Sequence, residues 1–290
     1  MQLKINRELN YEVVHFADEN VFIASIGNKI FYRHNHKQIT IRLPLTLIFK
    51  FFNLFRLTRR ALRLDKTNVF QVESGLIIIY QKKVYHYCFK SKQLKITLIL
   101  KNCRNVLHQS ISRAGKNIFF GEYGNNKHRK AVPVYRSTDE GHSWEEIFSF
   151  KPGTIKHVHG CYYDPYWDKI WVLTGDFVGE NYMIVADVDF KHIEWLGDGS
   201  QKWRAVNLFF NRDKVDWIMD SPLEKSYHYT FNRKSKIIAR KSLFLGPVWY
   251  IKRLSDKVFI AATGQEIGPG VLNDKANFYV SEDLEIWKKV

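Results

Sequence analysis

The stretch DPYWDKIWVLTGD, residues 164–176, carries a pattern that recurs along the chain: a polar turn followed by a short apolar strand that commonly ends in glycine. Such a phrase predicts a hairpin turn that enters a buried strand. Five further copies are ADENVFIASIG (17–27), VESGLIIIY (72–80), RAGKNIFFGEY (113–123), NRDKVDWIMD (211–220) and LSDKVFIAATG (254–264). The chain is therefore expected to contain six related units.

The spacing of these copies matches the blades of a propeller. The first strand residues of the six phrases are Val21, Leu76, Ile118, Ile170, Val215 and Val258, separated by 55, 42, 52, 45 and 43 residues. One blade of four strands typically occupies about 40–50 residues. The sequence predicts an all-β fold, a six-bladed β-propeller that forms a single domain over residues 1–290.

The long first spacing contains a helix-like segment, LTLIFKFFNLFRLTRRALRL at residues 45–64, directly after Pro44. Its polar residues recur at three- and four-residue intervals, which gives the helix one basic and one apolar face. These residues are Lys50, Asn53, Arg56, Arg60 and Arg63. We expect a helical insertion between the first two blades, packed on the propeller wall. The alternative is a peripheral contact of this basic amphipathic helix with an anionic membrane.

The charge balance points to an anionic partner. The chain has 45 Lys and Arg against 29 Asp and Glu, a formal net charge of +16. Such a charge attracts nucleic acid, anionic lipid or acidic polysaccharide. Nucleic acid is unlikely, because the basic residues are spread along the chain and no zinc-finger or RNP-like motif occurs. An acidic oligo- or polysaccharide is the favoured partner, and nothing in the sequence specifies an oligomeric state.

Cysteines and hydropathy indicate the compartment. Cys88, Cys103 and Cys161 are odd in number and unclustered, which argues against a disulfide framework. Residues 1–14, MQLKINRELNYEVV, lack the apolar core of a signal peptide, and no apolar run is long enough for a membrane span. We expect a cytoplasmic protein, membrane-associated if the helical insertion contacts lipid.

Residues 135–144, YRSTDEGHSW, have the composition of a side-chain-stabilised turn. Asp and Ser side chains bond to the backbone of such a turn, Gly supplies a positive φ and Trp packs between outer strands. The residues in register are Ser137, Asp139, Gly141, Ser143 and Trp144. Weaker copies of this pattern are Ser281, Asp283 and Trp287, and Asp187, Asp189 and Trp195.

This turn resembles the Asp box, with Ser in place of the usual Thr, and the chain resembles the sialidase-like Asp-box (BNR-repeat) propeller superfamily over nearly its whole length. Four phrases are also similar to those of bacterial propellers linked with surface polysaccharides: residues 121–123, 157–160, 174–176 and 199–206. The superfamily includes glycosidases, polysaccharide lyases and non-catalytic glycan binders. The resemblance therefore implies a carbohydrate ligand, but a fold that supports many chemistries assigns no reaction.

Propeller geometry selects the candidate site residues. Inner strands line the axis, and ligands bind at the mouth formed by the loops that enter them and the loops after the second strands. We predict that His157, His159, Tyr123, Glu122 and Asp176 are catalytic. We predict that Gln201, Trp203, Arg204, Arg129, Asp220 and Trp249 bind substrate.

The residue types fit two kinds of cleavage. His157 and His159 lie two apart on an expected strand, so both imidazoles point to the same side. A lyase would use one of them as a base and Tyr123 as an acid. A hydrolase would instead use two carboxylates, Glu122 and Asp176, at a suitable separation.

The substrate-binding candidates have structural alternatives. Arg204 beside Gln201 offers planar donors suited to a uronate carboxylate. Trp203 and Trp249 can stack on a sugar ring, although propeller cores also contain large aromatic residues. The His157 and His159 pair can bind a metal with Asp176 or serve as structural histidines bonded to the backbone. We expect neither a metal nor a cofactor.

The sequence thus predicts a carbohydrate-active propeller that cleaves an acidic oligo- or polysaccharide by hydrolysis or β-elimination at the central funnel. Sialidase activity is disfavoured, because no triad of arginines around a carboxylate is evident. The alternative is a non-catalytic glycan-binding or scaffold propeller in surface polysaccharide biosynthesis.

Overall fold

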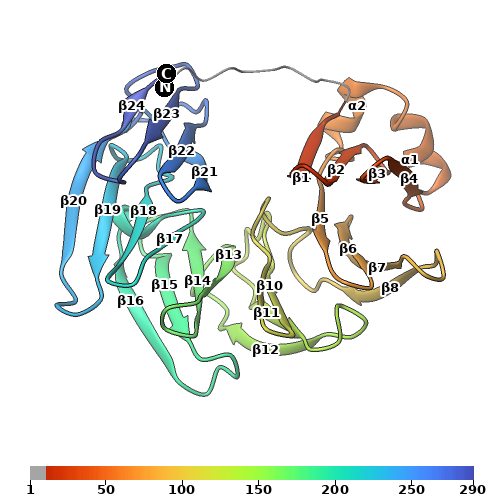
Figure 1. Ribbon diagram of the computed structural model, residues 1–290, viewed down its shortest axis with the longest axis horizontal. Helices are drawn as coiled ribbons and strands as arrows, with labels where there is room; N and C mark the ends of the chain where they lie inside the picture. Colours follow the sequence, from red (N-terminus) through yellow and green to blue (C-terminus); the bar gives the residue numbers. More distant parts are fainter. Residues whose placement is uncertain (1–10) are drawn as a thin grey trace.

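The computed structural model describes residues 11–290, which form six four-stranded sheets around a common axis (Figure 1). Each sheet is an antiparallel meander of four strands that are consecutive in the chain. The prediction of a six-bladed β-propeller is therefore confirmed. The prediction that the amino terminus carries no signal peptide falls mainly on residues 1–10, outside the described residues.

The strands of the first three blades are β1 (Val13–Ala17), β2 (Val21–Ile26), β3 (Lys29–His34), β4 (Lys37–Arg42), β5 (Thr67–Gln71), β6 (Gly75–Tyr80), β7 (Lys83–Cys88), β8 (Leu94–Ile99), β9 (Ser112–Ala114), β10 (Asn117–Gly121), β11 (Val132–Ser137) and β12 (Glu145–Phe150). Those of the last three are β13 (His157–Asp164), β14 (Lys169–Gly175), β15 (Asn181–Ala186), β16 (Ile193–Gly199), β17 (Phe209–Phe210), β18 (Lys214–Ile218), β19 (Tyr227–Asn232), β20 (Ile238–Leu243), β21 (Val248–Ser255), β22 (Val258–Thr263), β23 (Phe278–Ser281) and β24 (Lys288–Lys289). The helices are α1 (Leu47–Phe52), α2 (Arg56–Ala61) and the short 3-10 helix η1 (Gln201–Trp203).

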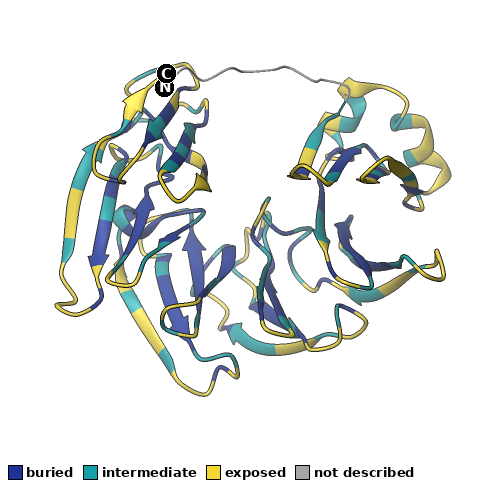
Figure 2. Ribbon diagram, viewed as in Figure 1, coloured by how far each residue is buried: buried dark blue, intermediate teal, exposed yellow. Residues whose placement is uncertain are grey.

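Each of the six sequence phrases forms the second strand of a blade: β2, β6, β10, β14, β18 and β22. All six residues of β6 are buried, as are six of the seven residues of β14. A strand covered on both faces is expected to be a continuous apolar run rather than an alternating one. Figure 2 shows buried middle strands and exposed outermost strands, whereas the innermost strands β1 and β21 of the first and sixth blades are mostly exposed.

The core of the protein lies between neighbouring blades. Five clusters of buried apolar side chains each join two consecutive blades. Trp171 and Trp217, fully buried, belong to the cluster between the fourth and fifth blades. Within residues 11–290 the first and sixth blades share no such cluster. They approach His108 of the third blade instead, with ring centroids 5.7 Å away for His15 and 6.2 Å for Tyr250.

The predicted helical insertion between the first two blades is present, but it consists of two short helices instead of one. Thr46 caps α1 by accepting a hydrogen bond from the Phe49 amide, at 3.4 Å. The helix ends at Phe52, and the Thr58 hydroxyl donates to the Phe52 carbonyl across the turn. Arg59 holds the insertion against the first blade through Glu12, at 2.7 Å.

A buried ion pair connects the fourth and fifth blades. Arg233 donates from Nη1 to Asp164 Oδ2 at 2.6 Å and from Nη2 to Asp164 Oδ1 at 2.9 Å. Trp171 Nε1 donates to the same carboxylate at 3.1 Å. Both charged side chains are almost completely excluded from solvent. Each therefore depends on the other for its electrostatic compensation.

We predict that Arg233→Met destabilises the protein by about 3–5 kcal/mol, because it leaves the buried Asp164 carboxylate without its counter-charge. Urea denaturation followed by tryptophan fluorescence measures this change. The control is Arg253→Met, which removes an exposed pair with Asp256 and should cost less than about 1 kcal/mol. Equal effects of the two substitutions would contradict the structural role of the buried pair.

Candidate functional site

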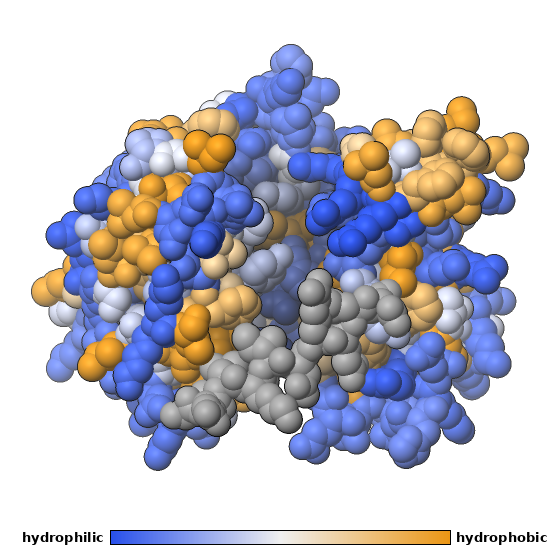
Figure 3. Space-filling model, turned by 90° about the horizontal axis from the view of Figure 1, so that it is seen from above, coloured by the Kyte–Doolittle hydropathy of each residue, from blue (hydrophilic) through white to orange (hydrophobic). Residues whose placement is uncertain are grey.

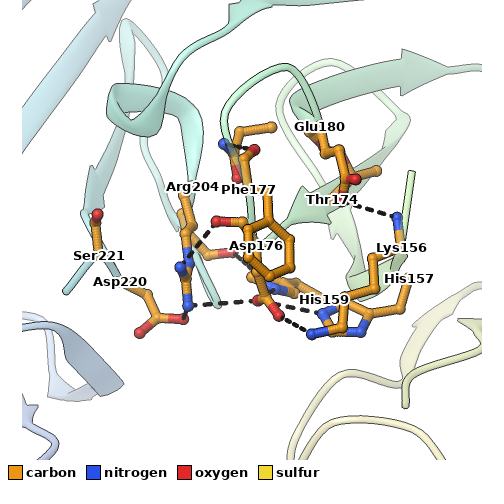
Figure 4. A network of polar contacts seen from close by, with 12 residues as sticks. Lys156, His157, His159, Thr174, Asp176, Phe177, Glu180, Arg204, Asp220 and Ser221 are labelled. Carbon is orange, nitrogen blue, oxygen red and sulfur yellow. Dashed lines mark hydrogen bonds and ion pairs between the residues drawn. The ribbon is translucent and has the colours of Figure 1, made fainter. Parts of the chain in front are cut away.

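The inner strands of the fourth and fifth blades start at the same mouth of the propeller where their second strands end (Figure 4). His157 begins β13, and Asp176 directly follows β14. Arg204 lies ahead of β17, and Asp220 comes two residues after β18. The structure thus brings these four predicted site residues together in one polar network.

The Asp176 carboxylate is the centre of this network. Its Oδ1 lies 3.1 Å from His159 Nε2, 3.3 Å from His157 Nε2 and 3.3 Å from Arg204 Nη2. Its Oδ2 accepts from Lys156 Nζ at 2.7 Å. Four basic side chains therefore surround one carboxylate. The two histidines meet it from the same side even though His159 lies at a β-bulge in β13.

The far nitrogens of the two histidines define their tautomers. His157 Nδ1 lies 2.8 Å from the Gly124 carbonyl, and His159 Nδ1 lies 2.8 Å from the Ala205 carbonyl. A carbonyl oxygen only accepts, so both Nδ1 atoms carry the proton. A neutral imidazole in this tautomer directs the lone pair of Nε2 towards the Asp176 carboxylate. The short distances between each Nε2 and the Asp176 carboxylate are favourable only if a further proton or a cation lies between the nitrogen and the oxygen.

The two carboxyl groups of the network have opposite pKa shifts. Burial by itself would raise the pKa of Asp176, but a proton on Nε2 of His157 and His159 outweighs burial and holds that pKa well below its usual range. Burial lowers the pKa of His157, against the opposing effect of Asp176. Burial raises the pKa of Asp220 to about 7, although Arg204 counteracts this shift. Near neutral pH, Asp176 is ionised and Asp220 is partly protonated.

Arg204 lies between the two aspartates. Its Nη2 is 3.3 Å from Asp176 Oδ1 and 3.6 Å from Asp220 Oδ2. Because one nitrogen reaches both, these two oxygens are at most about 7 Å apart. Asp220 Oδ1 and Arg204 Nε are buried without a hydrogen-bond partner among the described residues. Asp220 can therefore accept, and Arg204 can donate, one further hydrogen bond.

Gln201 and Arg204 also fix the backbone of the site. Gln201 Nε2 donates to the Asp176 carbonyl at 3.1 Å, and Arg204 Nη1 donates to the same oxygen at 2.9 Å. Gln201 Oε1 accepts from Ser221 at 2.6 Å, and its side chain is fully buried. The structure therefore gives Gln201 a positioning role within this network.

Tyr123 covers the histidine pair. Its ring centroid is 4.2 Å from that of His157 and 6.0 Å from that of His159. Burial, reinforced by Asp176 and Asp220, raises the pKa of the Tyr123 hydroxyl well above its usual range. The hydroxyl is therefore protonated near neutral pH.

The rim of the site contains two residues that the sequence did not single out, Lys156 and Phe177. Phe177 is about half exposed, and the Lys156 ammonium and the Arg129 guanidinium lie 5.2 and 5.3 Å from its ring. Arg129 also donates to Glu180 at 2.5 Å. Lys156 directly precedes His157, and Phe177 directly follows Asp176. This adjacency to predicted site residues is the sequence signal by which the two could have been found.

Glu122 is not part of the cluster. Its carboxylate accepts hydrogen bonds from three consecutive backbone amides and from the Tyr135 hydroxyl, at 2.5–3.0 Å. The amides are those of Lys101, Asn102 and Cys103. The side chain is completely buried, so these contacts give Glu122 a structural role rather than the predicted catalytic one.

The two predicted stacking residues differ in exposure. Trp203 is 5% exposed and stacks on Trp217 with 5.5 Å between ring centroids, so its indole belongs to the core. Trp249 is 39% exposed, and its Nε1 donates to Glu266 at 3.0 Å. Of these two, only Trp249 presents a surface to solvent.

Among the described residues, His157, His159 and Asp176 are the group with the geometry of metal ligands. One donor atom from each lies within 4.8 Å of the others. A cavity of about 880 Å³ is lined by residues on or next to the inner strands of all six blades, among them His15, Tyr166 and Arg253. None of the residues that line it belongs to the Asp176 network.

Comparison with known proteins supports the fold. No protein-family model matches the chain, and no curated protein does. Among solved structures, the extracellular domain of the putative one component system BT4673 from B. thetaiotaomicron is 11% identical with a TM-score of 0.59, over 97% of this chain and 33% of that one. The tricorn protease is 11% identical with a TM-score of 0.60, over 99% and 31%. An oligogalacturonate lyase in complex with manganese is 8% identical with a TM-score of 0.56, over 93% and 73%.

These similarities agree with a propeller fold, and the six four-stranded sheets define the class of the protein as a six-bladed β-propeller. The chain spans about a third of the length of the first two structures. At such low identity, the likeness concerns the path of the backbone alone. Membership of the Asp-box superfamily stays a prediction.

We predict that Glu122→Ala lowers the free energy of unfolding by about 3 kcal/mol, because buried backbone amides lose their acceptor. Tyr135→Phe, which removes one of the four hydrogen bonds, should cost about 1 kcal/mol. Chemical denaturation compares both variants with Glu145→Ala, a substitution on an exposed acidic residue. A Glu122→Ala variant as stable as wild type would contradict this assignment.

Proposed function

We propose that this propeller cleaves an acidic oligosaccharide or polysaccharide, by hydrolysis or β-elimination, at the mouth that contains Asp176 and Asp220. The observation that supports this proposal best is the pair of aspartates on one arginine, with pKa values shifted in opposite directions. Such divergence is typical of carboxyl groups with different tasks in acid–base chemistry.

Asp220 is the proposed proton donor. With its pKa raised to about 7, a substantial fraction of this carboxyl group carries a proton near neutral pH and can pass it to a leaving glycosidic oxygen. Its Oδ1 is buried and has no hydrogen-bond partner within the described chain, so one of its hydrogen bonds is left unmade. In hydrolysis, the ionised Asp176 is the proposed base that takes the proton of the attacking water. Asp176 also binds Lys156 and Arg204.

The separation of the two carboxylates is compatible with glycoside chemistry. Retaining enzymes place such groups about 5–5.5 Å apart, and inverting enzymes about 6.5–9.5 Å apart. Asp176 Oδ1 and Asp220 Oδ2 are at most about 7 Å apart. This limit permits the spacing of retaining enzymes and the shortest spacing of inverting ones. β-Elimination uses the same proton donor and needs a cation to neutralise the uronate carboxylate. It also needs a base to take the proton next to that carboxylate, a role for which the histidine pair is proposed.

Recognition of an acidic sugar is assigned to the cations of the rim. Lys156, Arg204 and Arg129 are placed around this mouth, and the net charge of +16 increases the local concentration of anions. A guanidinium group binds a carboxylate with two parallel hydrogen bonds. Phe177 and Trp249 supply exposed aromatic surface for the apolar face of a sugar ring.

The turn at residues 137–144 supports a place among the Asp-box propellers. The Asp139 carboxylate accepts from the Ser143 amide at 2.9 Å and from the Ser143 hydroxyl at 2.6 Å. Ser137 Oγ accepts from the Gly141 amide at 2.8 Å, and Gly141 has φ +88°. Trp144 Nε1 donates to Thr97 of the neighbouring blade. This network matches the role that the sequence pattern predicts for these residues.

A second candidate is a non-catalytic glycan-binding or scaffold propeller. The observation in its favour is that Lys156, Arg204 and Arg129 all bond to carboxylates of the chain itself. A ligand carboxylate would have to compete with these internal partners. Cleavage assays on the same variants distinguish the two functions.

We predict that Asp220→Asn lowers the turnover of an acidic oligosaccharide about 100-fold or more, because it removes the proton donor. Assays of reducing ends detect hydrolysis, and the ultraviolet absorbance of the unsaturated product detects β-elimination. Wild-type activity should fall as the pH rises above about 7, where Asp220, facing Arg204, His159, Glu266 and Asp176, loses its proton. His192→Ala is the control, because His192 is exposed and pairs with Asp187 away from the mouth.

Asp220→Asn should also change how the free energy of unfolding depends on pH. The folded protein binds the Asp220 proton more tightly than the unfolded chain, in which Asp titrates near about 4. The contribution of Asp220 to the free energy of unfolding should therefore fall as the pH rises from about 4 to about 7. The difference in this free energy between the wild type and Asp220→Asn should fall over the same range, because the buried histidines, whose pKa values are lowered, affect both proteins alike. Unchanged turnover by Asp220→Asn would refute the catalytic role, and binding without cleavage of any glycan would favour the scaffold function.

A further inference from the structure

We propose that His157, His159 and Asp176 bind a divalent transition-metal ion, the alternative that the sequence analysis named but did not favour. This inference shares Asp176 and the histidine pair with the glycan chemistry proposed above, but its test does not require a glycan. It rests on the direction of the lone pairs, the distances between the donor atoms and the partners of the histidines.

Lone pairs converge on the space between the three side chains. Each histidine donates its Nδ1 proton to a backbone carbonyl, Gly124 for His157 and Ala205 for His159. Both Nε2 atoms then face Asp176 Oδ1. If no proton or cation intervenes, three acceptors point at one another, which is electrostatically unfavourable. A metal ion resolves this conflict without additional protons.

The distances also fit coordination. His159 Nε2 and His157 Nε2 lie 3.1 and 3.3 Å from Asp176 Oδ1, and all three atoms are within 4.8 Å of one another. Ligands of a tetrahedral ion with bonds of about 2.0–2.1 Å are about 3.3 Å apart. The carbonyl partners correspond to the outer groups that orient ligating histidines in metalloproteins.

The remaining polar groups can adjust to a bound cation. Arg204 Nη2 now lies 3.3 Å from the Asp176 oxygen that would coordinate the ion. The same guanidinium also reaches Asp220, whose Oδ1 is buried without a partner among the described residues. Arg204 Nε is also buried without a partner among the described residues. A shift of Arg204 towards Asp220 would pair Arg204 Nε with Asp220 Oδ1 and leave Asp176 Oδ1 to the ion.

The donor set indicates the kind of metal. Two imidazoles and one carboxylate suit borderline ions such as Zn²⁺ and Co²⁺ better than Ca²⁺ or Mg²⁺, which prefer oxygen ligands. Three protein ligands leave coordination positions for water or a substrate atom. The proposed site is therefore of the open kind.

Metal titration of the full-length protein tests the site. After removal of metal with EDTA, calorimetry with Zn²⁺ should show one site per chain, and His159→Gln should weaken binding about 100-fold. His157→Gln is the second variant, for use if His159→Gln does not fold by circular dichroism. His192→Ala, which removes the exposed histidine paired with Asp187, should bind Zn²⁺ as the wild type does.

Substitution with Co²⁺ gives an independent readout, since visible absorption reports on its coordination by the protein. The spectrum should appear in the wild type and in Asp220→Asn and be lost in His157→Gln. The proposal is refuted if the wild type binds Zn²⁺ and Co²⁺ no more tightly than the histidine variants. Because no glycan is present, this result is separate from the outcome of the cleavage assays.

A different observation carries a second proposal: we infer that the surface formed by α1 and α2 docks on an anionic lipid bilayer. Six large apolar side chains of the insertion are more than half exposed: Leu47, Ile48, Phe51, Leu54, Phe55 and Leu57. Figure 3 shows hydrophobic side chains gathered at the right edge of the molecule, over this insertion. An exposed apolar group of this size usually marks an interaction surface.

The charge around this surface favours lipid over an apolar protein partner. Residues 20–64 contain nine Lys and Arg and no Asp or Glu. Arg59 pairs with Glu12, while Lys50, Arg56 and Arg60 lie on the two helices. Apolar side chains interspersed with basic ones are typical of helices that lie in the interface of an anionic membrane. None of the helices in the described part of the chain is long and apolar enough to cross a bilayer.

Vesicle co-sedimentation tests this surface. The protein should bind vesicles of phosphatidylcholine with phosphatidylserine, bind less to phosphatidylcholine alone, and dissociate at high salt. The triple variant Leu47→Ser, Phe51→Ser and Leu57→Ser should lose binding. Its matched control is Ile237→Ser with Ile286→Ser, two residues of similar exposure elsewhere. The proposal is refuted if the triple variant binds vesicles as well as the wild type does. It is also refuted if the wild type self-associates and only the triple variant abolishes this self-association, because the surface would then bind a second copy of the chain.

Discussion

The second strand of each blade is apolar on both faces, and a sheet that contains such a strand is stable only if another layer covers each face. Neighbouring blades provide this cover, as the fully buried β6 and the Trp171 and Trp217 pair illustrate. Packing of this kind sets the sheets side by side around an axis. It also brings the start of one inner strand next to the end of a second strand, so that His157 and Asp176, 19 residues apart, come into contact.

The fold could be predicted in detail because its signal is a local one. A continuous apolar run after a polar turn has the same physical cause in all six blades, so the phrases coincide with β2, β6, β10, β14, β18 and β22. The insertion was less predictable. Its periodicity indicates two faces, but not which face is covered, and the break after Phe52 depends on side-chain bonds of Thr58 and Arg59 to the backbone.

For the candidate site, the sequence predicts position better than side-chain direction. Strand ends place His157, His159 and Asp176 at one mouth, and the structure brings them together. Glu122 also follows a second strand, yet its carboxylate turns to the amides of residues 101–103. The direction of the Glu122 side chain therefore depends on a loop about 20 residues earlier in the chain. Trp203 likewise points into the core because Trp217 of the next blade offers a stacking partner.

The chemistry of the mouth depends on which positive charge faces Asp176 Oδ1. A guanidinium can reach it, but Arg204 is shared with Asp220 and is held by the Asp176 carbonyl. Protons on both Nε2 atoms would place two buried imidazolium groups side by side, with ring centroids 5.2 Å apart. A compact divalent cation provides the same compensation with a single particle and accepts both lone pairs at once.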